Sequence, residues 1–409
     1  MSDAATTYWQ NPGSPQDASQ GATGSALPET HDDSVFLLNG DLSEGVGNTG
    51  PSFIAGRGEN LFTGAIFASN AEVPSLQFPE GLTSWNGHVF VGTYNIDNPN
   101  SSRILVFDAK TGELEQTIGD KPGQELVSAG ALLGLSINPA TGDLYANANQ
   151  AGYVLRIQNP ASDHPDISIY SKYPTDAEFP PGPEDMAWSN NGWLYDSDSN
   201  NSRLYAIPPG GGDPVLMFGP PGSGAKFSDQ GLFAQHVPGG GLAPNGLVFS
   251  KDFQTLYAAN TDTDSVIAMP MGADGMPTGE IRTLAQNLND DYIQDPKGFE
   301  ELRFPDTRIG ATAGTPLNGP DGLALDSAGR IWVADAFGDN LTILDPQNGR
   351  IEGTIGSSAV TQGGLLNAPA SLTFVGDRIF ATNLGLFGPP WSVADFKVGV
   401  TGAGGNGNY

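Results

Sequence analysis

The sequence predicts an all-β fold, a six-bladed β-propeller of four-stranded blades whose ring is closed by a terminal segment. One short register returns six times, as PEGL at 79–82, LLGL at 132–135, PEDM at 183–186, PNGL at 244–247, PDGL at 320–323 and PASL at 369–372. An aromatic residue opening a second apolar run follows in each copy: Phe90, Tyr145, Tyr195, Tyr257, Trp332, Phe380. Repeats of about 50 residues built from short strands are typical of propeller blades, because one blade cannot bury both its faces alone.

Composition supports this class and a single domain. Glycine (56) and proline (32) make up about a fifth of the 409 residues, as many tight turns require, and no long heptad-like apolar pattern predicts helix. Repetition lets one propeller use this much chain. We therefore expect a polar N-terminal arm at 1–33 and one propeller over 34–409.

The blades are expected to begin near residues 76, 127, 182, 243, 318 and 367. In the first blade, the inner strand follows Glu80, and further strands are expected at 88–94, 103–108 and 115–118. The fifth copy, 318–356, repeats this pattern almost strand for strand. Before the first blade, SVFLL at 34–38 is a candidate strand, and 41–75 reads as irregular.

Ring closure is predicted to use distant segments. The sixth copy shows no obvious third and fourth strand after Asn383, so five blades are complete and one is not. The candidates to complete it are 391–400 and 34–38. Pairing them with the sixth blade would remove exposed strand edges.

Two connections between blades are much longer than the others, at 219–242 and 286–318. Such links lie on the face where inner strands begin, so they are expected to roof one mouth of the central channel. Their apolar and aromatic residues favour ordered lids: Phe227, Leu232, Phe233, Tyr292, Phe299, Phe304.

The chain is strongly acidic, with a net charge of −29 that results from having only 17 basic residues. This charge excludes nucleic acid and anionic membranes as expected partners and favours a cation. Zero cysteines exclude disulfides, cysteine–zinc sites and thiol catalysis. No stretch of about 18 apolar residues and no signal peptide are visible. The compartment stays open, although the lysine-poor, cysteine-free composition favours a periplasmic or secreted protein.

The repeats predict a ring of side chains at the second motif position. It reads Glu80, Leu133, Glu184, Asn245, Asp321, Ala370. Three carboxylates converging without a counter-charge would repel each other, whereas a hard divalent cation removes this penalty. Calcium binds Asp, Glu and Asn oxygens, so the predicted calcium ligands are Glu80, Glu184, Asn245 and Asp321. No copy has histidine or cysteine at this motif position, which weighs against zinc. The alternative is that Asn and Asp before glycine only suit a tight strand entry.

A second ring lies three residues after the aromatic positions. It reads Thr93, Ala148, Asp198, Asn260, Asp335, Asn383. Such residues usually cap the turn to the third strand, but Asp198, Asn260 and Asp335 are also candidates for the mouth of a substrate pocket. His236, in the first long connection, is the one histidine considered near substrate.

On these motifs the chain resembles the gluconolactonase, senescence marker protein (regucalcin) and paraoxonase superfamily of six-bladed propellers, with blades like NHL repeats, over about 76–385. The resemblance implies one divalent ion, commonly calcium, held by a first-blade Glu, a third-blade Asn, an Asn in N-G-L and an Asp in P-D-G. Glu80, Asn245 and Asp321 match these ligands. The third-blade position holds Glu184 in place of Asn.

The function expected is metal-dependent hydrolysis of a lactone or related ester, a small-molecule substrate. The resemblance implies Asp321 as the base that activates water, and Glu184 is an alternative base because crowding should raise its pKa. No G-x-S-x-G elbow, P-loop or dinucleotide fingerprint is present. Two alternatives remain, a non-enzymatic NHL-type binding propeller with a structural ion, and a lyase, isomerase or condensing enzyme on this scaffold.

Overall fold

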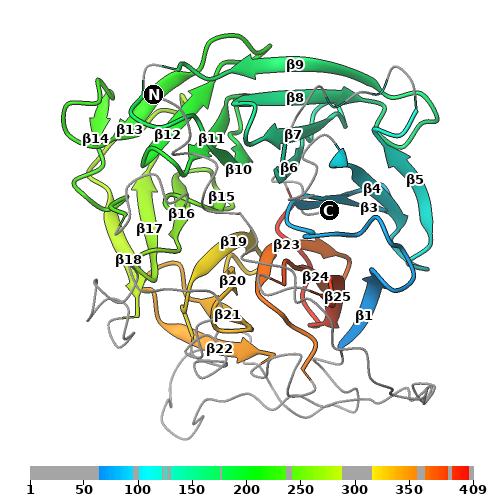
Figure 1. The fold of residues 1–409 in the computed structure, drawn as a ribbon. Helices are drawn as coiled ribbons and strands as arrows, with labels where there is room; N and C mark the ends of the chain where they lie inside the picture. The colour runs from blue at the N-terminus through cyan, green and yellow to red at the C-terminus, as the bar shows by residue number, and fades with distance from the viewer. Residues whose placement is uncertain are drawn as a thin grey trace, which may run out of the picture.

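The computed structural model describes residues 64–94, 101–121, 124, 126, 130–175, 177–235, 242–287, 316–356, 364–385 and 389–404. These residues form six antiparallel sheets arranged around a central axis, with the inner strands β2, β6, β10, β15, β19 and β23 nearest the axis (Figure 1). The predicted six-bladed propeller is therefore confirmed. The expected strand at 34–38 lies outside the described residues.

The blades follow one another along the chain. The first two are β2 (Leu82–Trp85), β3 (His88–Gly92), β4 (Ile104–Asp108), β5 (Leu114–Ile118) and β6 (Leu132–Ile137), β7 (Leu144–Ala148), β8 (Tyr153–Gln158), β9 (Asp166–Lys172). The next two are β10 (Pro183–Trp188), β11 (Leu194–Asp198), β12 (Arg203–Ile207), β13 (Val215–Gly219), β14 (Phe227–Ser228) and β15 (Leu247–Phe249), β16 (Thr255–Asn260), β17 (Ser265–Pro270), β18 (Arg282–Gln286). The last two are β19 (Pro320–Leu325), β20 (Ile331–Asp335), β21 (Asn340–Leu344), β22 (Ile351–Ile355) and β23 (Pro369–Val375), β24 (Arg378–Asn383), β25 (Ser392–Lys397), β1 (Gly64–Ser69).

The aromatic residue that recurs in each repeat packs between neighbouring blades. All six are at most 5% exposed. Tyr145 of blade two meets Trp188 of blade three with ring centroids 4.8 Å apart, and Trp332 of blade five meets Phe374 of blade six at 5.6 Å. The period detected in the sequence is thus the spacing of the contacts between blades. Within the described ranges, no helix has the length and apolar character needed to span a bilayer.

Blade six combines three strands from the C-terminal part of the chain with one strand from before the first blade. Strand β25 pairs with β24, as predicted for 391–400, and β1 pairs with β25 as the outermost strand (Figure 1). The expectation that 41–75 is irregular is wrong at Gly64–Ser69. The sequence does not predict this strand because it is an edge strand whose apolar residues are partly exposed, as Ile66 is 42% exposed. Phe67 packs on Phe380 with ring centroids 4.8 Å apart.

The described part of the first long connection is anchored to the core. Strand β14 pairs in parallel with β13 at the outer edge of blade three. Phe233 is fully buried between blades three and four, and Phe227 and Leu232 pack against the same cluster. The apolar residues therefore fix the loop, as expected of an ordered segment. Tyr292, Phe299 and Phe304 of the second connection lie outside the described residues.

Asp326 holds the turn between β19 and β20 of blade five through several hydrogen bonds. Its buried carboxylate accepts hydrogen bonds from Arg330 Nε (2.7 Å), Trp332 Nε1 (3.0 Å) and the backbone N–H groups of Ala328 and Arg330. We expect Asp326→Asn to lower the free energy of unfolding by about 2 to 3 kcal/mol, because hydrogen bonds to a buried charge contribute about that much. Urea denaturation checks this. Asp345→Asn, in a half-buried turn of the same blade, should cost less than about 1 kcal/mol, and equal losses in both variants would contradict the account.

Candidate functional site

The inner strands turn the second motif residue toward the axis. In β10 and β19 the pairing register shifts between Pro183 and Met186 and between Pro320 and Leu323, so Glu184 and Asp321 each lie in a bulge. Bulges re-aim side chains out of the regular alternation of a strand. Glu80 and Asn245 lie just before β2 and β15, where their N–H groups donate to Gly92 and Ala259 of the second strand. Four blades thus present one equivalent position.

The structure brings the four predicted ligands together. Glu80 and Glu184 share a side-chain hydrogen bond, and Asn245 and Asp321 share another. The negative charge of Asp321 also acts on Glu184, which links the two pairs. Glu184, Asn245 and Asp321 are at most 7% exposed. Leu133 and Ala370, at the equivalent positions of the other two blades, supply no polar group.

Burial and mutual repulsion favour the neutral forms of these carboxyl groups. Burial raises the pKa of Glu80 to about 7, with a further rise from the charge of Asp185 and an opposing effect of the hydrogen bond to Glu184. The pKa of Glu184 lies well above its usual range because of burial first and the charges of Glu80 and Asp321 second. Burial, Glu80 and Asp185 raise the pKa of Asp321 in the same way. In the part of the chain that the structure describes, the charged groups that act on these three pKa values are all carboxylates.

Neutral donors orient two of the four side chains. Ser199 Oγ donates to Glu184 Oε2 at 2.9 Å, and Asn149 Nδ2 from blade two donates to the same oxygen at 3.3 Å. Asn245 Nδ2 donates to Thr261 Oγ1 at 3.1 Å. The hydrogen bond between Asn245 and Asp321 lowers the pKa of Asp321, so the Asn245 amide N–H donates to this carboxyl group as well.

Sequence reasoning missed Asp185. Burial raises its pKa to about 6, although backbone N–H groups of Leu247 and Met186 donate to it and oppose the rise. The bond from Leu247 N to Asp185 Oδ2 is 2.8 Å long and joins blade three to blade four. A signal was available, because the third motif position is glycine in four copies and PEDM alone has a carboxylate there.

The donor set fits a hard divalent cation in its chemistry. Three carboxylates and one amide oxygen are the ligands calcium takes, and among the described residues the charged groups that act on them are further carboxylates. Within the ranges that the structure describes, no three His, Cys, Asp or Glu side chains stand in a ready-made metal-binding arrangement. The hydrogen bond between Glu80 and Glu184 requires a proton between the two carboxyl groups. Removing that proton leaves adjacent anions that a cation would stabilise.

The second ring has mainly structural contacts. Asp198 Oδ1 accepts from Gly182 N at 2.9 Å, and Asn260 Nδ2 donates to Leu232 O at 2.9 Å. Asp335 Oδ2 accepts from Leu317 N at 3.0 Å. These side chains are at most 1% exposed and tie loops to the blades. Their predicted place at the pocket mouth stays a prediction, and His236 lies outside the described residues.

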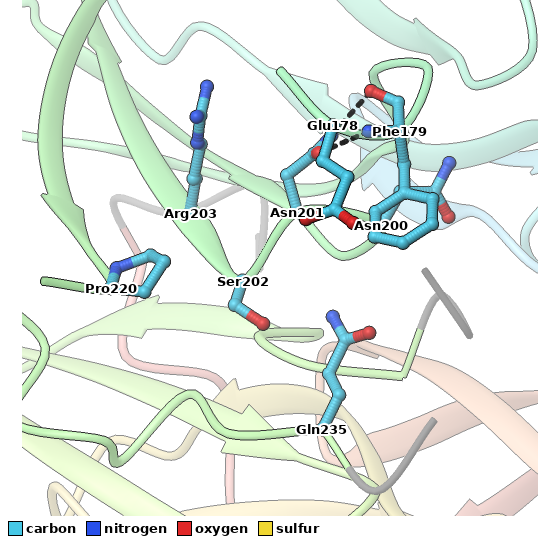
Figure 2. Close-up of a pocket in the computed structure, with 8 residues that line it drawn as sticks. All are labelled: Glu178, Phe179, Asn200, Asn201, Ser202, Arg203, Pro220 and Gln235. Carbon is cyan, nitrogen blue, oxygen red and sulfur yellow. Dashed lines mark hydrogen bonds between the residues drawn. The ribbon is translucent and has the colours of Figure 1, made fainter. Parts of the chain in front are cut away.

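A hollow of about 200 Å³ opens beside blade three (Figure 2). Figure 2 shows Asn201 and Phe179 hydrogen-bonded along one wall, with Gln235 separate from them. Gln235 donates to the carbonyl oxygens of Ser199 and Ala243, so it connects this hollow with the residue whose hydroxyl contacts Glu184. The hollow thus lies beside blade three, next to the axial site, which is the group of Glu80, Glu184, Asn245 and Asp321.

A comparison with protein-family models identifies the family of this chain. The model for the SMP-30/gluconolactonase/LRE-like region matches residues 102–362. The chain belongs to this family. The match spans blades two to five and includes three of the four axial residues, Glu184, Asn245 and Asp321.

Several solved protein structures are similar to this chain. A gluconolactonase from Xanthomonas campestris superposes with a TM-score of 0.51 at 17% identity, covering 82% of this chain and 89% of that one. The calcium-binding protein regucalcin from Agrobacterium tumefaciens gives 0.48 at 14% identity over 80% and 93% of the two chains. Virginiamycin B lyase from Staphylococcus aureus gives 0.47 at 15% identity over 79% and 83%. A search of curated protein sequences found no match.

Proposed function

We propose that this protein hydrolyses a lactone or a related ester at the axial site, with one divalent cation, preferably calcium, held by Glu80, Glu184, Asn245 and Asp321. The observation that supports this most is the grouping of the half-buried Glu80 with the buried Glu184, Asp321 and Asn245, on which only further carboxylates act as charged groups within the described residues. A purely structural position would gain stability from apolar residues there, since crowded buried acids cost free energy. Membership of a family that includes gluconolactonases supports the same reaction class.

Asp321 is the residue proposed to take a proton from the attacking water. Its pKa is raised by burial and by neighbouring carboxylates, which makes its ionised form a stronger base than an exposed aspartate. The hydrogen bond to Asn245 opposes the rise and orients the carboxyl group. A bound divalent cation would supply polarisation of the substrate carbonyl and stabilisation of the negative charge that develops on its oxygen.

Glu184 is the second candidate base. Its Oε2 atom accepts hydrogen bonds from Ser199 and Asn149, which fix the orientation of the carboxyl group. A carboxylate fixed in this way suits binding better than proton transfer. We therefore assign proton abstraction to Asp321 and a holding role to Glu184.

A substrate panel tests the reaction class. Purified protein is incubated with aldonolactones, acyl lactones and aryl esters, each with calcium, magnesium, manganese or zinc, and products are followed by mass spectrometry. We expect ring opening with the addition of one water, fastest with calcium. A folded, cation-loaded protein that turns over nothing in the panel would favour a binding propeller, and a product of unchanged mass would favour a lyase or isomerase.

A further inference from the structure

The inner strands of neighbouring blades meet at the axial residues in two different ways. Where the third motif residue is glycine, the next blade comes into direct contact with it. A Cβ atom at Gly134 would lie 2.4 Å from the carbonyl oxygen of Glu184, and one at Gly246 would lie 2.2 Å from that of Asp321. At these two places the backbone of an axial residue rests on the preceding blade, and a side chain there would displace it.

Blades three and six lack this glycine and use a hydroxyl in its place. They carry Asp185 and Ser371 at the third motif position, and Ser197 and Thr382 at the matching position of the second strand. The N–H groups of Asp185 and Ser371 donate to these hydroxyls, each at 3.0 Å. In blades one, four and five the same second-strand position is Gly92, Ala259 or Ala334, which have no hydroxyl.

Each of these hydroxyls then donates across the blade boundary to the backbone of an axial residue. Ser197 Oγ donates to Asn245 O at 2.9 Å, and Thr382 Oγ1 donates to Glu80 O at 2.8 Å. Thr261 of blade four makes a related bridge. It donates to Pro320 O at 2.8 Å, directly before Asp321, and accepts from the Asn245 amide.

From this pattern we propose that Ser197, Thr261 and Thr382 are positioning residues, through which the preceding blade sets the place of Asn245, Asp321 and Glu80 around the cation. The inference rests on the cation site proposed above and deepens it. All three hydroxyls are at most 3% exposed, so water cannot replace them without rearrangement. Removing one leaves a buried carbonyl without its donor and frees the axial backbone to shift. Groups that hold metal ligands in place typically affect affinity strongly.

Blade six offers a matched control. Thr373 is buried like Thr382, and it also joins blades six and one, through a 3.1 Å contact between its Oγ1 and Ser84 Oγ. The partner of the Thr373 hydroxyl in this contact is Ser84 and not Glu80. Thr382→Val and Thr373→Val therefore both remove a hydroxyl between the same two blades, and Thr382→Val removes the bond to the backbone of Glu80.

Calcium titration calorimetry on the full chain tests the proposal, with thermal melting in excess chelator as the measure of folding. We expect calcium affinity to fall about 10- to 100-fold in Thr382→Val, and to stay within about threefold of wild type in Thr382→Ser and Thr373→Val. Ser197→Ala, between other blades, should behave like Thr382→Val.

The outcomes separate this inference from the proposed function. Equal affinity in wild type and Thr382→Val, or an equal loss in Thr373→Val, would overturn the positioning role while leaving the cation site intact. A wild-type protein that binds no divalent cation would overturn both. A calcium-binding wild type without hydrolase activity would overturn the proposed reaction, and the affinity differences would still support the positioning residues.

Discussion

Asp321→Asn is expected to reduce turnover of the lactone substrate by about 10²- to 10⁴-fold, the usual contribution of a positioned general base. The substitution keeps an oxygen atom and the size of the side chain but removes the group that accepts a proton. Stability in chelator should be unchanged or slightly higher, because the raised pKa of Asp321 shows that its charged form is disfavoured in the fold. Steady-state kinetics with saturating calcium, together with melting curves, measure both effects.

Asp326→Asn is the control for this experiment. It changes the same residue type just beyond the far end of strand β19, where the carboxylate holds Arg330 and Trp332. This variant should lose stability and keep its turnover number, which is the opposite pattern to Asp321→Asn. If Asp321→Asn retains full turnover, Asp321 is not the base, and the same measurement on Glu184→Gln decides whether Glu184 takes that role.

Removal of the cation should make stability strongly dependent on pH. Glu80 has a pKa of about 7 in the fold, and burial and neighbouring carboxylates also raise the pKa values of Glu184 and Asp321 well above their usual range, whereas unfolded carboxyl groups titrate near 4. Between these pH values the folded state binds more protons than the unfolded state, so stability falls as pH rises. We expect the chelated protein to melt at a clearly lower temperature at pH 8 than at pH 5. The change should be on the order of a few kcal/mol, since one pKa unit equals about 1.4 kcal/mol.

Calcium should offset this dependence. Deprotonation at pH 8 supplies the anionic ligands, and a cation at 100 times its Kd stabilises the native state by about 2.7 kcal/mol. Glu80→Gln, which cannot ionise, should flatten the pH dependence in chelator and weaken the response to calcium. Melting curves of both proteins at pH 5 and pH 8, with calcium or with chelator, give the comparison. A chelated wild type that is more stable at pH 8 than at pH 5 would contradict the assigned protonation states.

The repeat allowed most of the fold to be predicted, because one hydrophobic period determines both the strands and the contacts between blades. Tyr145 and Trp332 each follow the motif of their own repeat at a similar distance, and both are buried between blades. The sequence pattern and the packing therefore have the same origin. Strand β1 was missed because it has no motif of its own. It pairs with β25 through its backbone, and which distant segment adds the last strand depends on chain geometry that no local pattern records.

The axial residues were predictable for the same reason, since a repeat in register brings equivalent positions to one place. Their supporting groups were not. Asp185 occupies a position that is glycine in most copies, and its partner, the N–H of Leu247, comes from another blade. Likewise, the roles of Ser197 and Thr382 depend on which carbonyl the next blade presents. These polar contacts across blades depend on which groups the closed ring brings together, and the spacing within one repeat does not record them.

The most direct test of the central claim is a crystal structure of the protein grown with calcium at pH 8, with anomalous scattering used to identify the ion. We predict one calcium ion on the propeller axis with oxygen atoms of Glu80, Glu184, Asn245 and Asp321 at about 2.3–2.6 Å. In that state the hydrogen bond between Glu80 and Glu184 should be broken. An axis without an ion at saturating calcium, with Glu80 and Glu184 still hydrogen-bonded to each other, would contradict the account.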